Sequence, residues 1–67
     1  MIDGKKMRSL REARGMTQEQ LASAVGVARQ IITRAETGTK ELSLAVAAAV
    51  ARELGCKVDD LLWHNND

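Results

Sequence analysis

The sequence between residues 17 and 38, TQEQLASAVGVARQIITRAETG, constrains the fold most, because it predicts two short helices joined by a tight turn. Thr17 and Gln20 have the spacing of a capping box, which starts a helix, and Gly26 is the residue type that commonly ends one. Apolar side chains recur on one face of each helix, first at Leu21, Ala22 and Val25, then at Ala28, Ile31, Ile32 and Ala35. The opposite face of the second helix holds hydrogen-bond donors and no acidic residue: Arg29, Gln30, Thr33, Arg34 and Thr37.

This pattern resembles the helix-turn-helix of the phage lambda repressor and Cro family, also called the xenobiotic-response-element type. The resemblance lies in the small, turn and apolar positions of the motif together with two polar ones: Gln18, Leu21, Ala22, Val25, Gly26, Val27, Ile32 and Glu36. Small Ala22 lets the two helices cross closely, and Gly26 makes the turn between them. The resemblance covers roughly residues 5 to 63 and implies an all-α, compact five-helix, lambda-repressor-like DNA-binding domain. A helix pair without a role in DNA binding is the alternative.

Helix-capping residues and apolar periodicity predict five helices in a single domain spanning residues 1–67. Their expected ranges are 6–14, 18–25, 28–36, 44–54 and 58–62. Ser43 should cap the fourth helix, whose inward face is expected to hold Leu44, Ala47, Ala48, Ala51 and Leu54. Ala28 stands where the family usually has a Ser or Thr cap, a loss that costs ~1 kcal/mol.

Composition limits the classes of function. Phe and Tyr are absent, so the core of this 67-residue chain must consist mainly of aliphatic side chains and Met. Cys56 is the single cysteine and His64 the single histidine, which leaves no cluster for a metal or cofactor and no catalytic set. We therefore expect no enzymatic activity, and an exposed position for His64 in the tail. No apolar run is long enough to span a bilayer, so we expect no membrane partner. The single cysteine cannot form an internal disulfide, which fits a reducing cytoplasm.

Charge is unevenly distributed along the chain. Residues 1–40 hold eight basic and four acidic side chains, whereas residues 41–67 hold two basic and five acidic ones. The net charge is therefore +4 in the first part and −3 in the second, although the whole chain carries only +1. A basic half suits a polyanion such as DNA, and an acidic half facing away from it avoids repulsion.

The donor-rich helix predicts contacts in the major groove of double-stranded DNA. Arginine can bind guanine through two hydrogen bonds, and glutamine can bind adenine in the same way. The predicted base-contacting residues are Arg29, Gln30, Thr33 and Arg34, and the alternative for the two arginines is a solvated helix face. The resemblance implies contacts to the DNA backbone from Thr17, Gln18, Thr37 and Lys40. Ile31 is expected to pack at the edge of the core, with contact to a thymine methyl as the alternative.

Two further groups of residues concern contacts between helices and between chains. The resemblance implies an ion pair between Arg11 in the first helix and Glu36 at the end of the third; two independent surface charges are the alternative. Large apolar side chains gather near the end of the chain, at Val58, Leu61, Leu62 and Trp63, and predict a homodimer interface. In the alternative, Leu61 and Trp63 fold back onto the first helix within one monomer. A two-fold dimer would bind an imperfect palindrome in DNA.

The sequence thus predicts a sequence-specific, double-stranded DNA-binding transcriptional regulator. Repression is the commoner role in the family that it resembles, and activation is the alternative sign of regulation. No small-molecule effector is evident, and the chain has little room for an effector domain. An antitoxin-like protein-interaction module is the second hypothesis for the function.

Overall fold

A computed structural model describes residues 2–63 of the chain. They form four α-helices and one turn of 3-10 helix: α1 (Gly4–Ala13), α2 (Gln18–Val25), α3 (Arg29–Thr37), α4 (Leu44–Leu54) and η1 (Val58–Leu61). Within residues 2–63, β structure is limited to one isolated antiparallel bridge between Ile2 and Leu62. The all-α fold class predicted from the sequence is therefore confirmed, with a 3-10 turn in place of a fifth α-helix.

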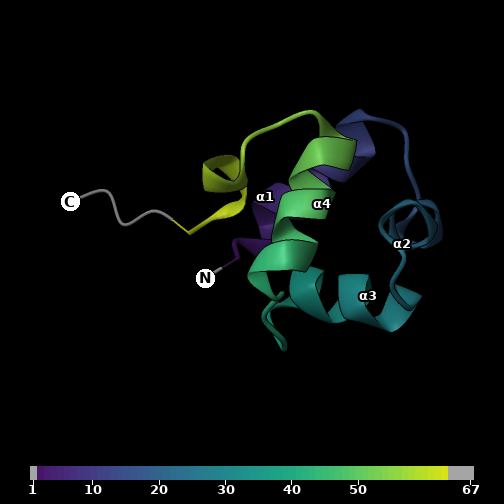
Figure 1. The fold of residues 1–67 in the computed structure, drawn as a ribbon, viewed down its shortest axis with the longest axis horizontal. Coiled ribbons are helices and arrows are strands. Elements are labelled where there is room, and N and C mark those ends of the chain that lie inside the picture. Colours follow the sequence, from purple (N-terminus) through teal and green to yellow (C-terminus); the bar gives the residue numbers. More distant parts are fainter. Residues whose placement is uncertain (1, 64–67) are drawn as a thin grey trace.

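The helices enclose a small core to which every element contributes. Figure 1 shows α4 in front of α1, with α3 running across the lower side of the bundle toward α2. The α2 helix contacts both α3 and α4, and α3 also contacts α1. The largest fully buried side chains come one from each element in turn: Met7, Leu21, Ile32, Val50 and Leu61. The bundle therefore depends on all five segments, and α3 is held from two sides.

The first helix begins two residues earlier than predicted. Asp3 caps α1 by accepting a hydrogen bond from the backbone N–H of Lys6 at 3.2 Å, so Gly4 rather than Lys6 is its first residue. A Cβ atom at Gly4 would overlap the carbonyl oxygens of Ala35 and Glu36. The start of α1 thus lies directly against the end of α3, at a separation that only glycine permits.

The helix-turn-helix segment follows the sequence prediction closely. Thr17 and Gln20 form both hydrogen bonds of the capping box, at 3.0 and 2.8 Å, and Gly26 ends α2 with a φ of 86°. The third helix is displaced by one residue from its predicted range, because Ala28 is an N-cap without a side-chain hydrogen bond and Thr37 extends the last turn. The hydroxyl of Thr37 lies 3.1 Å from the carbonyl oxygen of Thr33 and donates back to its own helix.

The fourth helix has its predicted bounds and its predicted Ser43 cap, and its inward face was predicted correctly for Ala47, Ala51 and Leu54, with Ala48 only half-buried. Leu44 was expected to point inward and is 77% exposed, whereas Val50 was not expected in the core and is fully buried. The buried stripe is Ala47, Val50, Ala51 and Leu54, which has the i, i+3, i+4, i+7 spacing of one helix face. Leu44 precedes this stripe by one turn, as the first residue of α4.

The burial of Leu54 and the exposure of Leu44 can be tested by making the same substitution at both positions of α4. Leu54→Ala should destabilise the fold by about 2–5 kcal/mol, because it leaves a cavity where a side chain only 3% exposed now packs. Leu44→Ala should change the free energy of unfolding by no more than about 0.5 kcal/mol. Chemical denaturation of both variants measures the difference, and equal losses would show that Leu44 is packed inside the bundle.

Candidate nucleic-acid interface

The α3 helix separates a buried face from a polar, exposed one. Ile32, Ala35 and Glu36 are buried against the other helices. Arg29, Gln30 and Arg34 are exposed, and Thr33 between them is half-buried. The four residues predicted to contact bases therefore share one side of α3, the side turned away from the core.

A buried ion pair fixes the end of α3 to α1. The Arg11 guanidinium donates from Nε to Glu36 Oε2 at 2.7 Å and from Nη2 to Glu36 Oε1 at 3.1 Å. The two side chains are only 9% and 3% exposed. The hydrogen bond to Glu36 raises the pKa of Arg11 against the opposing effect of burial, so the guanidinium stays charged.

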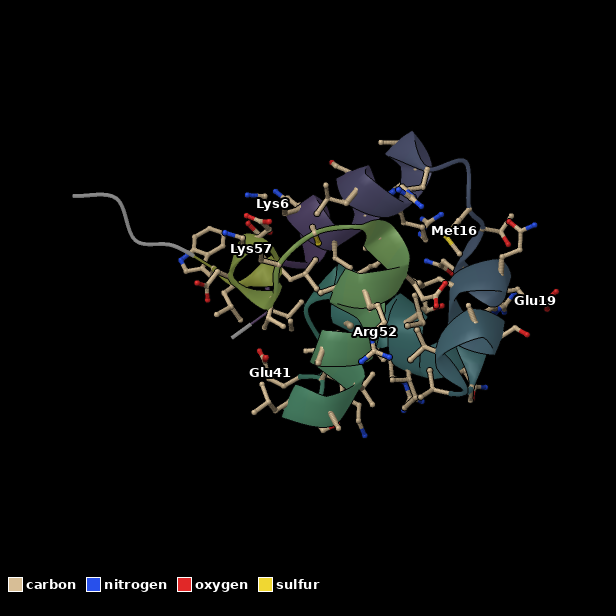
Figure 2. The ribbon with its side chains drawn as sticks, turned by 45° about the horizontal axis from the view of Figure 1, so that its top comes forward. Lys6, Met16, Glu19, Glu41, Arg52 and Lys57 are labelled. Carbon is tan, nitrogen blue, oxygen red and sulfur yellow. The ribbon has the colours of Figure 1, made fainter. Side chains whose placement is uncertain are left out.

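Arg11 also stabilises the turn that leads into α2. Its Nη1 donates to the carbonyl oxygen of Met16 at 2.7 Å, and Met16 lies where this turn enters α2 (Figure 2). One side chain therefore connects α1, the α1–α2 turn and α3. Two independent surface charges, the alternative considered for Arg11 and Glu36, do not describe this arrangement.

Gln18 extends the same network toward the exposed face of α3. Its Nε2 donates to Glu36 Oε1 at 3.1 Å, and its Oε1 accepts a hydrogen bond from the Thr33 hydroxyl at 2.8 Å. Sequence reasoning assigned Gln18 and Thr33 only to DNA contacts and missed these internal bonds. Polar contacts between helices have no periodic signature, so nothing in the sequence pattern indicates them.

The residues predicted to contact the DNA backbone form two groups, one at the start of α2 and one at the end of α3. Thr17, Gln18 and Arg29 line one open cleft of about 450 Å³, formed where α1 ends and α2 begins. The N-terminus of α2 opens into this cleft, and backbone N–H groups at such a position favour an anion. Thr37 and Lys40 are exposed at the other end, in the last turn of α3 and the loop after it. The predicted backbone contacts therefore lie at two separate places on the surface.

One member of the predicted dimer interface is corrected by the structure. Leu61 is fully buried within the single chain, where η1 contacts α1 and α4, so its side chain cannot reach a partner while this fold holds. The backbone of Asp3 adds a 2.7 Å hydrogen bond to the Leu61 carbonyl. Val58 and Leu62 are half-buried against the core, and Trp63 is 62% exposed. Leu61 thus follows the fold-back alternative, whereas Trp63 remains accessible.

The remaining residues considered in the sequence analysis are Ile31, Cys56, His64 and the possible metal ligands. Ile31 is half-buried and is not among the side chains packed against the core cluster, so the expected core-edge packing is weak. Cys56 is half-buried, and burial followed by the nearby Asp60 charge raises the pKa of its thiol. Within residues 2–63, no three His, Cys, Asp or Glu side chains gather to hold a metal ion. His64, predicted as an exposed tail residue, lies outside the described part of the chain.

Comparison with known proteins identifies the family. A helix-turn-helix family model, HTH_3, matches residues 7–61, and the chain belongs to this Cro/C1-type family. It is 47% identical, over 91% of its length, to an uncharacterised HTH-type transcriptional regulator of Methanothermobacter thermautotrophicus, of which the match covers 90%.

Two solved structures share the fold over nearly their whole length. One is the restriction-modification controller protein C.AhdI from Aeromonas hydrophila, with a TM-score of 0.83 and 32% identity over 88% of this chain and 89% of that one. The other is the P22 c2 repressor in complex with a synthetic operator, with a TM-score of 0.87 and 27% identity over 92% of this chain and 94% of that one.

The ion-pair network predicts a loss of stability when the Arg11 cation is removed. Arg11→Met should destabilise the fold by about 3–5 kcal/mol, because it leaves the Glu36 carboxylate buried without its cation. Arg8→Met is the matched control, since Arg8 forms an exposed ion pair with Glu12 in the same helix and should cost less than about 1 kcal/mol. Thermal unfolding measures both variants. An unchanged melting temperature for Arg11→Met would mean that the pair contributes nothing to the position of α3.

Proposed function

We propose that this chain is a sequence-specific transcriptional regulator that inserts α3 into the major groove of double-stranded DNA. The exposed face of α3 supports this proposal most directly, because it presents Arg29, Gln30 and Arg34 to solvent with no acidic side chain among them. A helix of this size fits the groove, where each base pair offers a distinct pattern of donors and acceptors. The names of the relatives, and the operator bound by the P22 c2 repressor, support the same role.

The proposed contacts divide into two kinds. Arg29, Gln30, Thr33 and Arg34 contact base edges and select the sequence. Thr17, Gln18, Thr37 and Lys40 contact the backbone, which sets the register on the duplex without selecting bases. For Ile31, which is half-buried in α3, we propose contact with a thymine methyl.

Repression by occupying an operator is the mode of action that we propose. The role is one of binding, with no catalytic step, and it places the protein in the cytoplasm with the chromosome. Among residues 2–63, no helix is long and apolar enough to span a membrane. The comparisons favour a regulator over the antitoxin-like alternative, because the relatives carry the names of transcriptional regulators.

Selection of bound sequences from a random duplex library tests this function. We expect enrichment of one short motif, and loss of that enrichment when Arg29, Gln30 and Arg34 are all replaced by alanine. The triple variant should unfold at nearly the same temperature as the original chain, since all three side chains are exposed. Failure to enrich any sequence at low salt would contradict the proposal.

Single substitutions separate base contacts from backbone contacts. Arg29→Ala or Gln30→Ala should cost ~1–3 kcal/mol at one base position and relax selectivity there. Lys40→Ala should instead weaken binding to all sequences alike and reduce the salt slope by ~1, because it removes one phosphate contact. Affinities for a panel of single-base variants, measured at several salt concentrations, distinguish the two. Uniform weakening by Arg29→Ala would show that Arg29 contacts the backbone instead.

We also propose that two chains form a two-fold dimer around Trp63. Val58 and Leu62, half-buried shortly before it in the chain, would join this interface, and a tryptophan 62% exposed on so small a domain favours burial there. Such a dimer places two α3 helices about 34 Å apart, one turn of B-DNA, so the operator is an imperfect palindrome.

Dilution tests this dimer through its tryptophan. The emission of Trp63 should shift to longer wavelength as the protein is diluted through the dissociation range. Trp63→Ala should weaken association at least about tenfold in sedimentation, because an aromatic side chain central to an interface contributes strongly to its affinity. Leu44→Ala, which removes an exposed apolar side chain at the start of α4, is the control and should leave association unchanged. A monomer at high micromolar concentration would contradict the dimer.

A further inference from the structure

The hydrogen bonds between Glu36, Gln18 and Thr33 have a fixed direction. A carboxylate can only accept hydrogen bonds, and the Glu36 carboxylate accepts two from Arg11. The Gln18 atom that lies 3.1 Å from Glu36 Oε1 must therefore be its amide nitrogen. This contact fixes which end of the Gln18 amide faces which neighbour.

The orientation of Gln18 determines what the Thr33 hydroxyl must do. With Nε2 turned to Glu36, the Gln18 oxygen faces Thr33 Oγ1 at 2.8 Å. An amide oxygen only accepts, so the hydroxyl must donate its single proton. The second acceptor within reach is the backbone carbonyl of Arg29 at 3.2 Å, which also belongs to the protein. The Thr33 proton therefore points into the protein in either geometry.

We propose that Thr33 contacts DNA as a hydrogen-bond acceptor and not as a donor, and that it selects an exocyclic amino group in the major groove. With its proton committed inside, the hydroxyl retains only lone pairs for an outside partner. Adenine N6 and cytosine N4 are the donors that base pairs offer in this groove. Thr33 then cannot donate to the acceptor atoms of guanine or thymine.

This assignment rests on the proposed function and adds an acceptor that the two flanking arginines lack. Arg29 and Arg34 carry donors only and favour guanine. Thr33, half-buried between them, supplies the complementary acceptor. Through the Gln18 amide, the buried Glu36 carboxylate thereby fixes the direction in which the Thr33 hydroxyl donates.

Base analogues test the assignment on the operator selected for the original chain. Thr33→Val, which keeps the shape and removes the hydroxyl, identifies the base pair that Thr33 contacts. At that pair, replacing adenine by purine or cytosine by 2-pyrimidinone removes the amino group. It should lower affinity about three- to tenfold for the original chain and leave Thr33→Val unaffected. Replacing the purine of the pair by its 7-deaza analogue removes an acceptor, and its effect should be the same for the original chain and for Thr33→Val.

Different results would contradict the Thr33 assignment and the proposed function. Three results would each overturn the assignment while leaving the proposed function in place: no change in base preference for Thr33→Val, insensitivity to loss of the amino group, or a 7-deaza effect that Thr33→Val abolishes. Absence of any enriched operator would overturn the proposed function itself, and the contact assigned to Thr33 with it.

The internal part of the inference is tested on the free protein without DNA. Gln18→Met, Thr33→Val and the double variant form a double-mutant cycle, in which the melting temperature of each variant is compared with that of the original chain. Because the two side chains share one hydrogen bond, the double variant should melt at about the temperature of its less stable parent. Strictly additive shifts would show that Gln18 and Thr33 do not interact, and would overturn the inference whatever the DNA experiments give.

Discussion

The bidentate contact between Arg11 and Glu36 is the interaction on which the exposed face of α3 depends. A buried ion pair brings little net stability, because desolvation of the two charges offsets their attraction. Its value here is geometric: a planar guanidinium that also binds the Met16 carbonyl allows few orientations of Glu36 relative to α1. Gly4 reinforces this placement by admitting the start of α1 against the last turn of α3. The orientation of α3 is therefore set by polar contacts and close backbone approach as well as by apolar packing.

The small core explains why the chain depends on such contacts. Five elements each supply one large, fully buried side chain, and alanines at Ala22, Ala35, Ala47 and Ala51 fill the crossings between them. Alanine lets helices approach closely but buries little area, so a domain of this size is only marginally stable. Burial of Trp63 in a dimer would add apolar contact that the monomer does not provide.

The sequence predicted those features that local chemistry controls. The caps at Thr17 and Ser43, the stop at Gly26 and the apolar stripes placed the helix bounds within two residues. Features that depend on neighbours distant in sequence were missed, including the inward bonds of Gln18 and the close approach at Gly4. Leu44 and Leu61 show the same limit, because periodicity marks them as apolar but not as covered or uncovered. Leu61 is buried because η1 packs against α1 and α4. Leu44, the first residue of α4, is left exposed.

The central claim is that the Arg11–Glu36 network holds α3 so that its outer face binds DNA. Nuclear magnetic resonance of the isotopically labelled chain, titrated with its selected duplex, tests this most directly. The account predicts that the largest amide shifts fall on Arg29, Gln30, Thr33 and Arg34 and on the flanking positions 17–18 and 37–40. The side-chain Nε resonance of Arg11 should stay in place, because its bond to Glu36 is kept in the complex. Shifts centred on α4 instead, or a displaced Arg11 resonance, would contradict it.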